Sequence, residues 1–195
     1  MPKISHLAVI VECVAIFGSG VASGQGRIQL DGGEKRYINE TLGFSIVVPS
    51  GWSVTPDRNA PIFTNFRPSE AHAQLELPRG GAIIIVDQEP PGALSKPLSQ
   101  WAKEDVRGLS SGTPSVGSFV PPAAAEITDA IFITFDTATF GPDDQKQHCV
   151  NVYWEFRKQR FSAHLSYVFG DPRGRAHEKI LFEAVRSFRP LLPIK

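Results

Sequence analysis

Cysteine is scarce in this chain of 195 residues, which contains only Cys13 and Cys149. Cys13 lies in a predicted signal peptide, residues 1–24, so cleavage would leave Cys149 alone and exclude a disulfide within the mature chain. An excess of charge of one sign is also missing, because 20 basic residues balance 20 acidic ones. Loss of Lys3 and Glu12 with the leader keeps that balance. The neutral chain gives no electrostatic reason to expect nucleic acid as a partner.

The residue patterns of common catalytic and metal sites are missing as well. The mature chain has four histidines, and none has a second His or a Cys pair at metal-ligand spacing: His72, His148, His164 and His177. His148 and Cys149 are neighbours, but neighbouring residues of a strand point to opposite faces, which argues against a thiolate–imidazole pair. No Gly-x-Ser-x-Gly elbow or phosphate-binding loop occurs. We therefore predict no catalytic residue, no metal and no cofactor, and a chain that is not an enzyme.

The N-terminus has the parts of an export signal. Lys3 supplies positive charge, residues 7–17 are largely apolar, and a segment of small and polar residues follows. The apolar segment is shorter than a membrane span and contains Glu12. No small residue precedes Cys13, as lipid attachment would require. We expect contact with the membrane only transiently, through the signal peptide 1–24, and a mature chain that is soluble in the periplasm or outside the cell.

The remainder divides into a linker and one domain. Residues 25–36 are rich in glycine and polar residues and are predicted to be a flexible linker. Residues 37–192 are predicted to form a single domain, since 42% of the chain is hydrophobic, enough for one core. In its first half, a hairpin is predicted at Ser50–Gly51, and the apolar run 82–86 suits a central strand covered on both faces. Strands are predicted over 42–49, 52–54, 62–66 and 82–86.

The second half alternates between helical and strand patterns. A helix is predicted over 95–109, and a second one starts at Asp171–Pro172 and ends before Pro190. A long loop is predicted over 110–125, followed by strands over 127–135, 147–157 and 160–169. Short turns join these late strands, one of them at Lys158–Gln159. We therefore predict an α+β fold, a mainly antiparallel β-sheet with helices packed on its faces.

The last two strands carry the candidate binding residues. In the predicted register Val150, Val152, Trp154 and Phe156 lie opposite Tyr167, Leu165, Ala163 and Phe161 on an apolar face. The other face is polar, and Tyr153 is predicted to lie opposite His164. The candidate ligand-binding residues there are Asn151, Tyr153, Glu155 and His164, with Ser162 beside them. The same residues are also compatible with a solvated surface or with polar groups under a covering loop.

Four features together resemble the PsbP-like proteins, a family that includes the Ran-binding import factor Mog. They are residues 42–52, Leu-Gly-Phe-Ser-Ile-Val-Val-Pro-Ser-Gly-Trp, then a mid-chain helix, late antiparallel strands, and a final helix ending at 185–188. The resemblance implies an α/β/α sandwich and a binding or accessory role for exported members. It transfers no catalytic residue, because members of this fold mostly act as binding or accessory modules, and each residue of the motif has a structural use.

These observations predict an exported, non-enzymatic accessory protein that binds an unknown protein or small molecule. One alternative is an exported enzyme that uses Glu155 and His164 on the polar sheet face, which requires a concave pocket there. A second alternative is a structural component of an envelope complex, which requires a large exposed apolar patch.

Overall fold

The computed structural model describes residues 26–41, 43–55, 61–65, 77–89, 94–120, 127–137, 145–156 and 158–191. The predicted signal peptide lies outside these residues, and so does the turn that Gly141-Pro142-Asp143-Asp144 predicts between the strands 127–135 and 147–157. The strands are β1 Arg27–Asp31, β2 Glu34–Asn39, β3 Phe44–Val47, β4 Ser53–Thr55, β5 Ile62–Thr64, β6 Ala82–Gln88, β7 Ser115–Ser118, β8 Ile127–Asp136, β9 Gln147–Phe156, β10 Gln159–Val168 and β11 Arg189–Pro190. The helices are α2 Leu98–Asp105 and α3 Gly174–Arg186.

The strands form two antiparallel sheets. The larger sheet has the order β4-β5-β6-β10-β9-β8-β7, and the smaller has the order β1-β2-β3-β11. The apolar run 82–86 is in β6, which lies between β5 and β10, as its sequence predicts. The fold is therefore α+β with mainly antiparallel sheets and helices on their faces, which confirms the predicted class.

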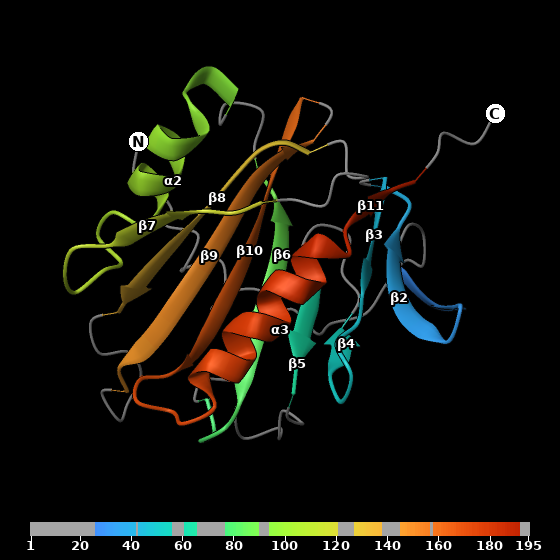
Figure 1. The fold of residues 1–195 in the computed structure, drawn as a ribbon, viewed down its shortest axis with the longest axis horizontal. Coiled ribbons are helices and arrows are strands. Elements are labelled where there is room, and N and C mark those ends of the chain that lie inside the picture. The colour runs from blue at the N-terminus through green and yellow to red at the C-terminus, as the bar shows by residue number, and fades with distance from the viewer. Residues whose placement is uncertain are drawn as a thin grey trace, which may run out of the picture.

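Alternation of side chains along the long strands assigns each helix to one face of the large sheet. Val150, Val152 and Trp154 of β9 share a core with Leu181 and Val185 of α3. Cys149 and Tyr153, which alternate with these residues along β9, pack with Leu98 and Ala102 of α2 instead. Successive strand residues point to opposite faces, so α2 and α3 cover opposite sides of the sheet. In Figure 1, α3 crosses in front of the large sheet, and β2 and β3 of the small sheet lie beside α3.

Aromatic rings join α3 and the small sheet to the large sheet. Phe44 of β3 stacks on Phe188 with ring centroids 5.1 Å apart, and it meets Phe161 of β10 at 5.7 Å. Trp154 of β9 lies 5.4 Å from Phe188. All four rings are buried, and such pairs add to the free energy gained by burying their area. This cluster holds the chain just after α3 against the sheet, because Phe188 lies two residues beyond the end of the helix.

The predicted linker over 25–36 is wrong, because β1 and β2 form a hairpin there. Gly32 and Gly33 both have positive φ, 58° and 90°, as a two-residue hairpin turn requires. Gly26 lies against the buried ring of Tyr37, where a Cβ would stand 2.0 Å from the hydroxyl oxygen. These glycines make a turn and a close contact, whereas the composition alone suggested flexibility.

The predicted hairpin at Ser50–Gly51 is also wrong, although the chain does turn there. Gly51 has a φ of 78°, but β3 pairs with β2 and β11, whereas β4 pairs with β5 in the other sheet. The turn therefore carries the chain from one sheet to the other. The predicted loop 110–125 likewise contains a strand, β7, which pairs with β8 at the edge of the large sheet.

The predicted register of β9 and β10 is displaced by two residues. Phe161 lies opposite Trp154 and Leu165 opposite Val150, with Phe156 paired to Gln159 across the turn. A shift of two preserves the faces, because the side-chain period of a strand is two. The apolar and polar faces are as predicted, but Tyr153 lies opposite Ser162 and not opposite His164.

The last helix starts later than the predicted N-cap at Asp171. The Asp171 carboxylate accepts hydrogen bonds from the backbone N–H groups of Arg173, at 2.8 Å, and of Gly80, at 2.6 Å. Asp171 therefore closes a turn and ties it to the loop before β6, and α3 begins at Gly174. In the part of the chain that the structure describes, no helix is long and apolar enough to cross a membrane.

Candidate functional site

The predicted polar face of β9 and β10 lies beneath α2. Asn151 and Tyr153 are 4% and 0% exposed. Asn151 donates to the Tyr153 hydroxyl at 2.9 Å, and that hydroxyl donates to the Asp105 carboxylate of α2 at 2.7 Å. The rings of Trp101, also on α2, and Tyr153 meet edge to face at 5.4 Å. These two candidate residues therefore hold α2 on the sheet and are not an open surface.

A second chain of hydrogen bonds runs beside the first. The buried Ser162 hydroxyl donates to the Glu89 carboxyl at 2.5 Å, and it accepts from Nε2 of His164 at 2.7 Å. Glu89 is 7% exposed. Burial raises the pKa of Glu89 to about 8, aided by the nearby charges of Asp105 and Asp87 and opposed by the Ser162 hydrogen bond. The carboxyl is therefore mostly protonated at neutral pH.

Glu155 and His164, the candidate pair for an enzyme, are bonded to different partners. The Glu155 carboxylate accepts from Nε of Arg160 at 2.8 Å, and Nη2 of Arg160 also donates to the Lys96 carbonyl at 2.5 Å. His164 is bonded to Ser162, whose side chain is fully buried. The Arg160 contact holds the chain just before α2, as Tyr153 holds its C-terminal end. The Arg160 and Tyr153 contacts position α2, whereas the His164–Ser162 bond lies within β10.

Cys149, the single cysteine among the described residues, belongs to this buried side. Cys149 is 3% exposed, and its sulfur lies 3.4 Å from the Ser166 hydroxyl. Burial raises the pKa of the Cys149 thiol to about 11, so the reactive thiolate is scarce at neutral pH. The side chain points away from His148, as the alternation along β9 predicts.

His148, on the opposite face, is the centre of an accessible polar cluster. It pairs with Asp136 across β8 and β9, and Nδ1 lies 2.7 Å from the Asp136 carboxylate. Nε2 lies 3.7 Å from the Glu178 carboxylate of α3. Glu178 in turn accepts a hydrogen bond from the Tyr167 hydroxyl at 2.7 Å. Lys146 lies 3.3 Å from the other carboxylate oxygen of Asp136.

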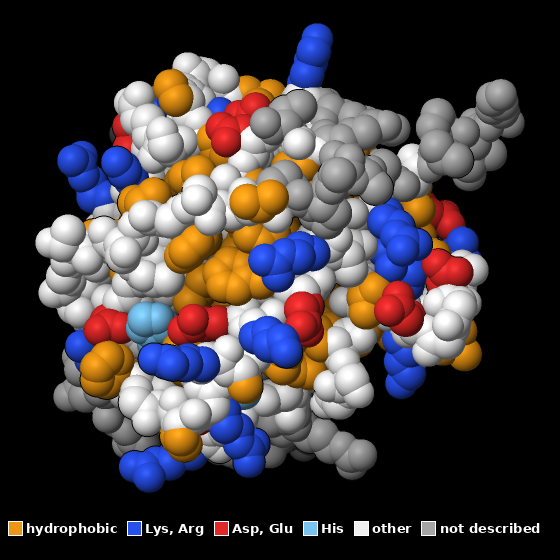
Figure 2. Space-filling model, in the orientation of Figure 1, with side chains coloured by type: hydrophobic (Ala, Val, Ile, Leu, Met, Phe, Trp, Pro, Cys, Tyr) orange, Lys and Arg blue, Asp and Glu red, His pale blue; other side chains and the backbone are white. Residues whose placement is uncertain are grey.

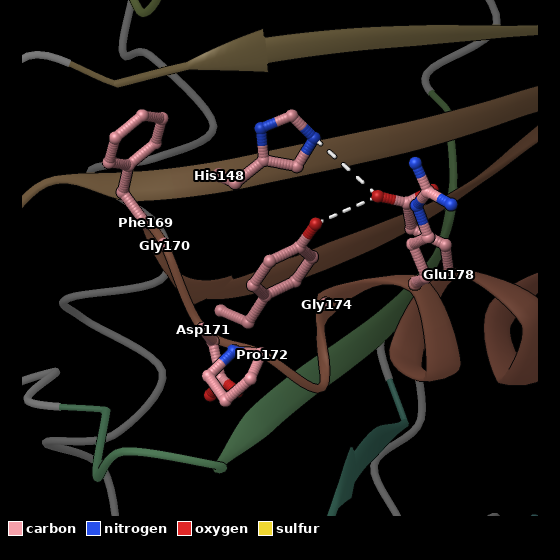
Figure 3. A pocket seen from close by; sticks show the side chains of 9 residues that line it. His148, Phe169, Gly170, Asp171, Pro172, Gly174 and Glu178 are labelled. Atoms are coloured by element: carbon pink, nitrogen blue, oxygen red, sulfur yellow. Dashed lines mark hydrogen bonds and ion pairs between the residues drawn. The ribbon is translucent and has the colours of Figure 1, made fainter.

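Two pockets meet at His148. One has a volume of about 390 Å³ and is bounded by the end of β10, the following turn and the start of α3. In Figure 3 Glu178 lies on one side of His148 and Phe169 on the other, with the turn of Asp171 and Pro172 below them. The lining residues are His148, Tyr167, Phe169, Gly170, Asp171, Pro172, Gly174, Arg175 and Glu178.

The second pocket, of about 340 Å³, lies on the Asp136 side of His148. The segment between α2 and β7 forms one wall of it and supplies several hydroxyl groups. Lys146, Asp136 and His148 form the opposite wall. The hydroxyl-bearing lining residues are Ser110, Ser111, Thr113, Ser115 and Thr134.

The charge state of Asp136 determines which nitrogen of His148 carries a hydrogen. Burial alone would raise the pKa of Asp136, but hydrogen bonds and charge from His148 and Lys146 outweigh it and lower that pKa. The ionised carboxylate accepts Nδ1–H, so in the neutral ring Nε2 is an acceptor that faces Glu178. Burial and the Glu178 carboxylate raise the pKa of Tyr167, which remains a hydrogen-bond donor.

The cluster is suited to binding a ligand more than to nucleophilic catalysis. In a hydrolytic triad, the histidine nitrogen remote from the carboxylate takes a proton from a hydroxyl or thiol. Here that nitrogen, Nε2, faces the Glu178 carboxylate. Within the described ranges, no group of three or more His, Cys, Asp or Glu residues is placed to hold a metal ion.

Sequence reasoning missed the pairing of Asp136 with His148. The signal was available, because both residues lie at facing ends of two predicted consecutive strands, and an antiparallel pairing brings such ends together. The third member, Glu178, could not be found in this way. It approaches only because α3 crosses the sheet at that point.

No family model matches the chain, and no curated protein is significantly similar to it. Several solved structures are similar at low identity, among them the three that follow. LpqN, involved in cell envelope biogenesis of Mycobacterium tuberculosis, is 10% identical with a TM-score of 0.50 over 76% of this chain and 83% of that chain. The Ran-binding protein Mog1p of Saccharomyces cerevisiae is 13% identical, with a TM-score of 0.47, and the match covers 87% of this chain and 97% of that chain. The PsbP protein of the cyanobacterium Synechocystis is 14% identical, with a TM-score of 0.37, and the match covers 89% of this chain and 98% of that chain. The match to LpqN confirms the predicted PsbP-like fold, and at this identity it shows the fold alone.

Proposed function

We propose that this chain is an exported, non-enzymatic accessory protein that binds a protein or small-molecule partner through the surface around His148. We call this the His148 surface: His148, Asp136, Glu178, Tyr167 and the two pockets beside them. The observation that carries the proposal is that both pockets share His148, whose ring is hydrogen-bonded to the Asp136 carboxylate and has the Glu178 carboxylate on its other side. Ligand sites commonly combine such preformed concavities with a few fixed polar groups.

Apolar side chains extend this surface along α3. Phe182 lies one helical turn after Glu178 and meets Phe132 of β8 with ring centroids 5.3 Å apart. Both rings are half-buried. Figure 2 shows hydrophobic side chains gathered in the middle of this face and a histidine between acidic side chains at their border. An apolar centre with a polar border is the usual composition of a recognition surface.

Export is the part of the proposal that rests on residues 1–24, which have the pattern of a signal peptide. The alternative of a structural component of an envelope complex is less well supported. The large hydrophobic side chains exposed among the described residues are spread over several segments: Ile28, Leu30, Leu94, Val116, Val120 and Phe169. Of these, Ile28 and Leu30 share one strand.

A fragment library screened by ligand-observed NMR tests the binding surface. Fragments should bind the wild-type chain, and His148→Ala should abolish most of this binding, because it removes the wall that both pockets share. Lys179→Ala is the matched control, since Lys179 is exposed on α3 and pairs with Glu183 at 3.7 Å, away from both pockets. Fragment binding that is unchanged in His148→Ala would overturn the proposed surface.

The non-enzymatic part is tested separately with ester, phosphate, peptide and glycoside substrates. No turnover above that of a heat-inactivated sample is expected. Turnover that disappears in Glu155→Gln or His164→Ala would instead establish the enzyme alternative, whatever the fragments show.

A further inference from the structure

We propose that β1 of one chain pairs with β1 of a second copy, so that two small sheets join into one continuous antiparallel sheet. Among the strands that the structure describes, β1 is the terminal one of its sheet and pairs with β2 on one side. Among the terminal strands of the two sheets, β1 has five residues, β7 four, β4 three and β11 two. A long terminal strand presents the most backbone groups to a second strand.

The hairpin geometry determines which backbone groups of β1 point outward. Asp31 and Glu34 flank the two-residue turn, and in such a hairpin the flanking residues form a hydrogen-bonded pair. Hydrogen-bonded pairs alternate along an antiparallel ladder, so Gln29 and Arg27 also bond toward β2. The N–H and C=O groups of Ile28 and Leu30 therefore point away from β2, where a partner strand can meet them.

The sequence of β1 is complementary to itself in the antiparallel direction. With Gln29 on the two-fold axis, Ile28 of one chain lies opposite Leu30 of the other, and their outward groups form hydrogen-bonded pairs. In the same register Arg27 lies opposite Asp31 of the second chain, twice by symmetry. Opposite charges and apolar pairs directly across two strands are the arrangements that stabilise a sheet.

The exposure of these side chains is consistent with an interface. Ile28 is 51% exposed and Leu30 69%, although both are large and apolar. Arg27 and Asp31 do have partners within the chain, Glu40 at 3.1 Å and Arg189 at 3.8 Å. Those ion pairs are at the surface and are therefore weak, so pairing with a second chain can compete with them. An edge-to-edge interface is small, and we expect a weak dimer in equilibrium with the monomer.

Cysteine cross-linking tests the register directly, in a chain with Cys13→Ser. The two copies of Gln29 would be a directly opposed, non-hydrogen-bonded pair, the kind with the closest side chains. Gln29→Cys should therefore form a disulfide-linked dimer under mild oxidation. The control is Ser118→Cys on the terminal strand β7, and buried Cys149 is shielded from reaction. Cross-linking of Gln29→Cys no faster than that of Ser118→Cys would overturn the proposal.

Charge reversal tests the same pairing without a covalent bond. Arg27→Asp and Asp31→Arg should each weaken dimerisation about tenfold, because each places like charges opposite one another twice. Mixing the two variants should restore dimerisation in sedimentation experiments, because both acidic side chains of one variant then face both basic side chains of the other. The mixture Lys179→Asp with Glu183→Arg carries the same charge changes on α3 and should not associate more than wild type. Equal association in both mixtures, or none in either, would contradict β1 pairing.

Discussion

Replacing Glu89 with Gln should change how stability depends on pH. Burial raises the pKa of Glu89 from 4.5 to about 8. The folded chain therefore keeps this proton up to about pH 8, whereas the unfolded chain releases it near pH 4.5. Between these values the unfolded state binds fewer protons, so the free energy of unfolding falls as pH rises. Gln cannot ionise and still accepts the Ser162 hydrogen bond, so the variant lacks this fall.

The size of the effect follows from the shift of the pKa. One unit corresponds to about 1.4 kcal/mol, so the rise from pH 5 to pH 8 should favour the variant over wild type by up to about 4 kcal/mol. Urea denaturation at pH 5, 6, 7 and 8 measures this difference, and other titrating groups cancel because both chains share them. Glu183→Gln, at an exposed position of α3, is the control and should follow wild type. A Glu89→Gln curve parallel to wild type would refute a protonated, buried Glu89.

Three further predictions concern buried side chains. Tyr153→Phe and Asp105→Asn should each lower the free energy of unfolding, measured by urea denaturation, by about 1–3 kcal/mol. The double variant should lose less than the sum of the two single losses, because both remove the same hydrogen bond. Additive losses would contradict the Tyr153–Asp105 contact. Burial lowers the pKa of His177, so the wild-type chain should lose stability as pH falls below the ordinary histidine range, when the unfolded state takes up the proton first. His177→Phe should lose less between pH 7 and 5 by thermal denaturation, and an equal loss would argue against a buried neutral ring. Phe188→Ala should cost about 3–5 kcal/mol by emptying the aromatic cluster around α3, and a loss below about 1 kcal/mol would place Phe188 outside the core.

The sequence predicted elements well where a periodic pattern ran through them. Ile131, Ile133 and Phe135 alternate along β8 and form the face that packs with α2. Leu181, Ala184 and Val185 recur at helical spacing and form the buried face of α3. Such periodic patterns indicate which side chains are buried, because the apolar residues of each element lie on the one face that is removed from water.

Predictions were wrong where one composition is compatible with two structures. Glycines 26, 32 and 33 suggested a linker, but they permit a close contact and a tight turn. The turn at Gly51 joins two sheets, which local sequence does not distinguish from a hairpin. The predicted register of β9 and β10 was displaced by two residues, because hydrophobic alternation restricts a register only to steps of two.

The candidate site depended on helix placement, which the strand patterns did not contain. The polar face of Asn151 and Tyr153 was predicted correctly as a face, but α2 covers it and uses its hydroxyl and amide groups as anchors. His148 belongs to the opposite face and becomes a site only where Glu178 of α3 approaches it. Contacts between a helix and a strand far apart in the sequence are determined by the packing of the whole fold.

Mapping amide chemical shifts by ¹⁵N NMR during titration with a fragment tests whether the fragment binds at the His148 surface. The proposed His148 surface predicts that the perturbed amides gather at residues 110–115, 145–148 and 167–178, and that Glu178→Gln weakens the perturbation. Perturbations confined to α2 or to β1, with the amides around His148 unchanged, would contradict it.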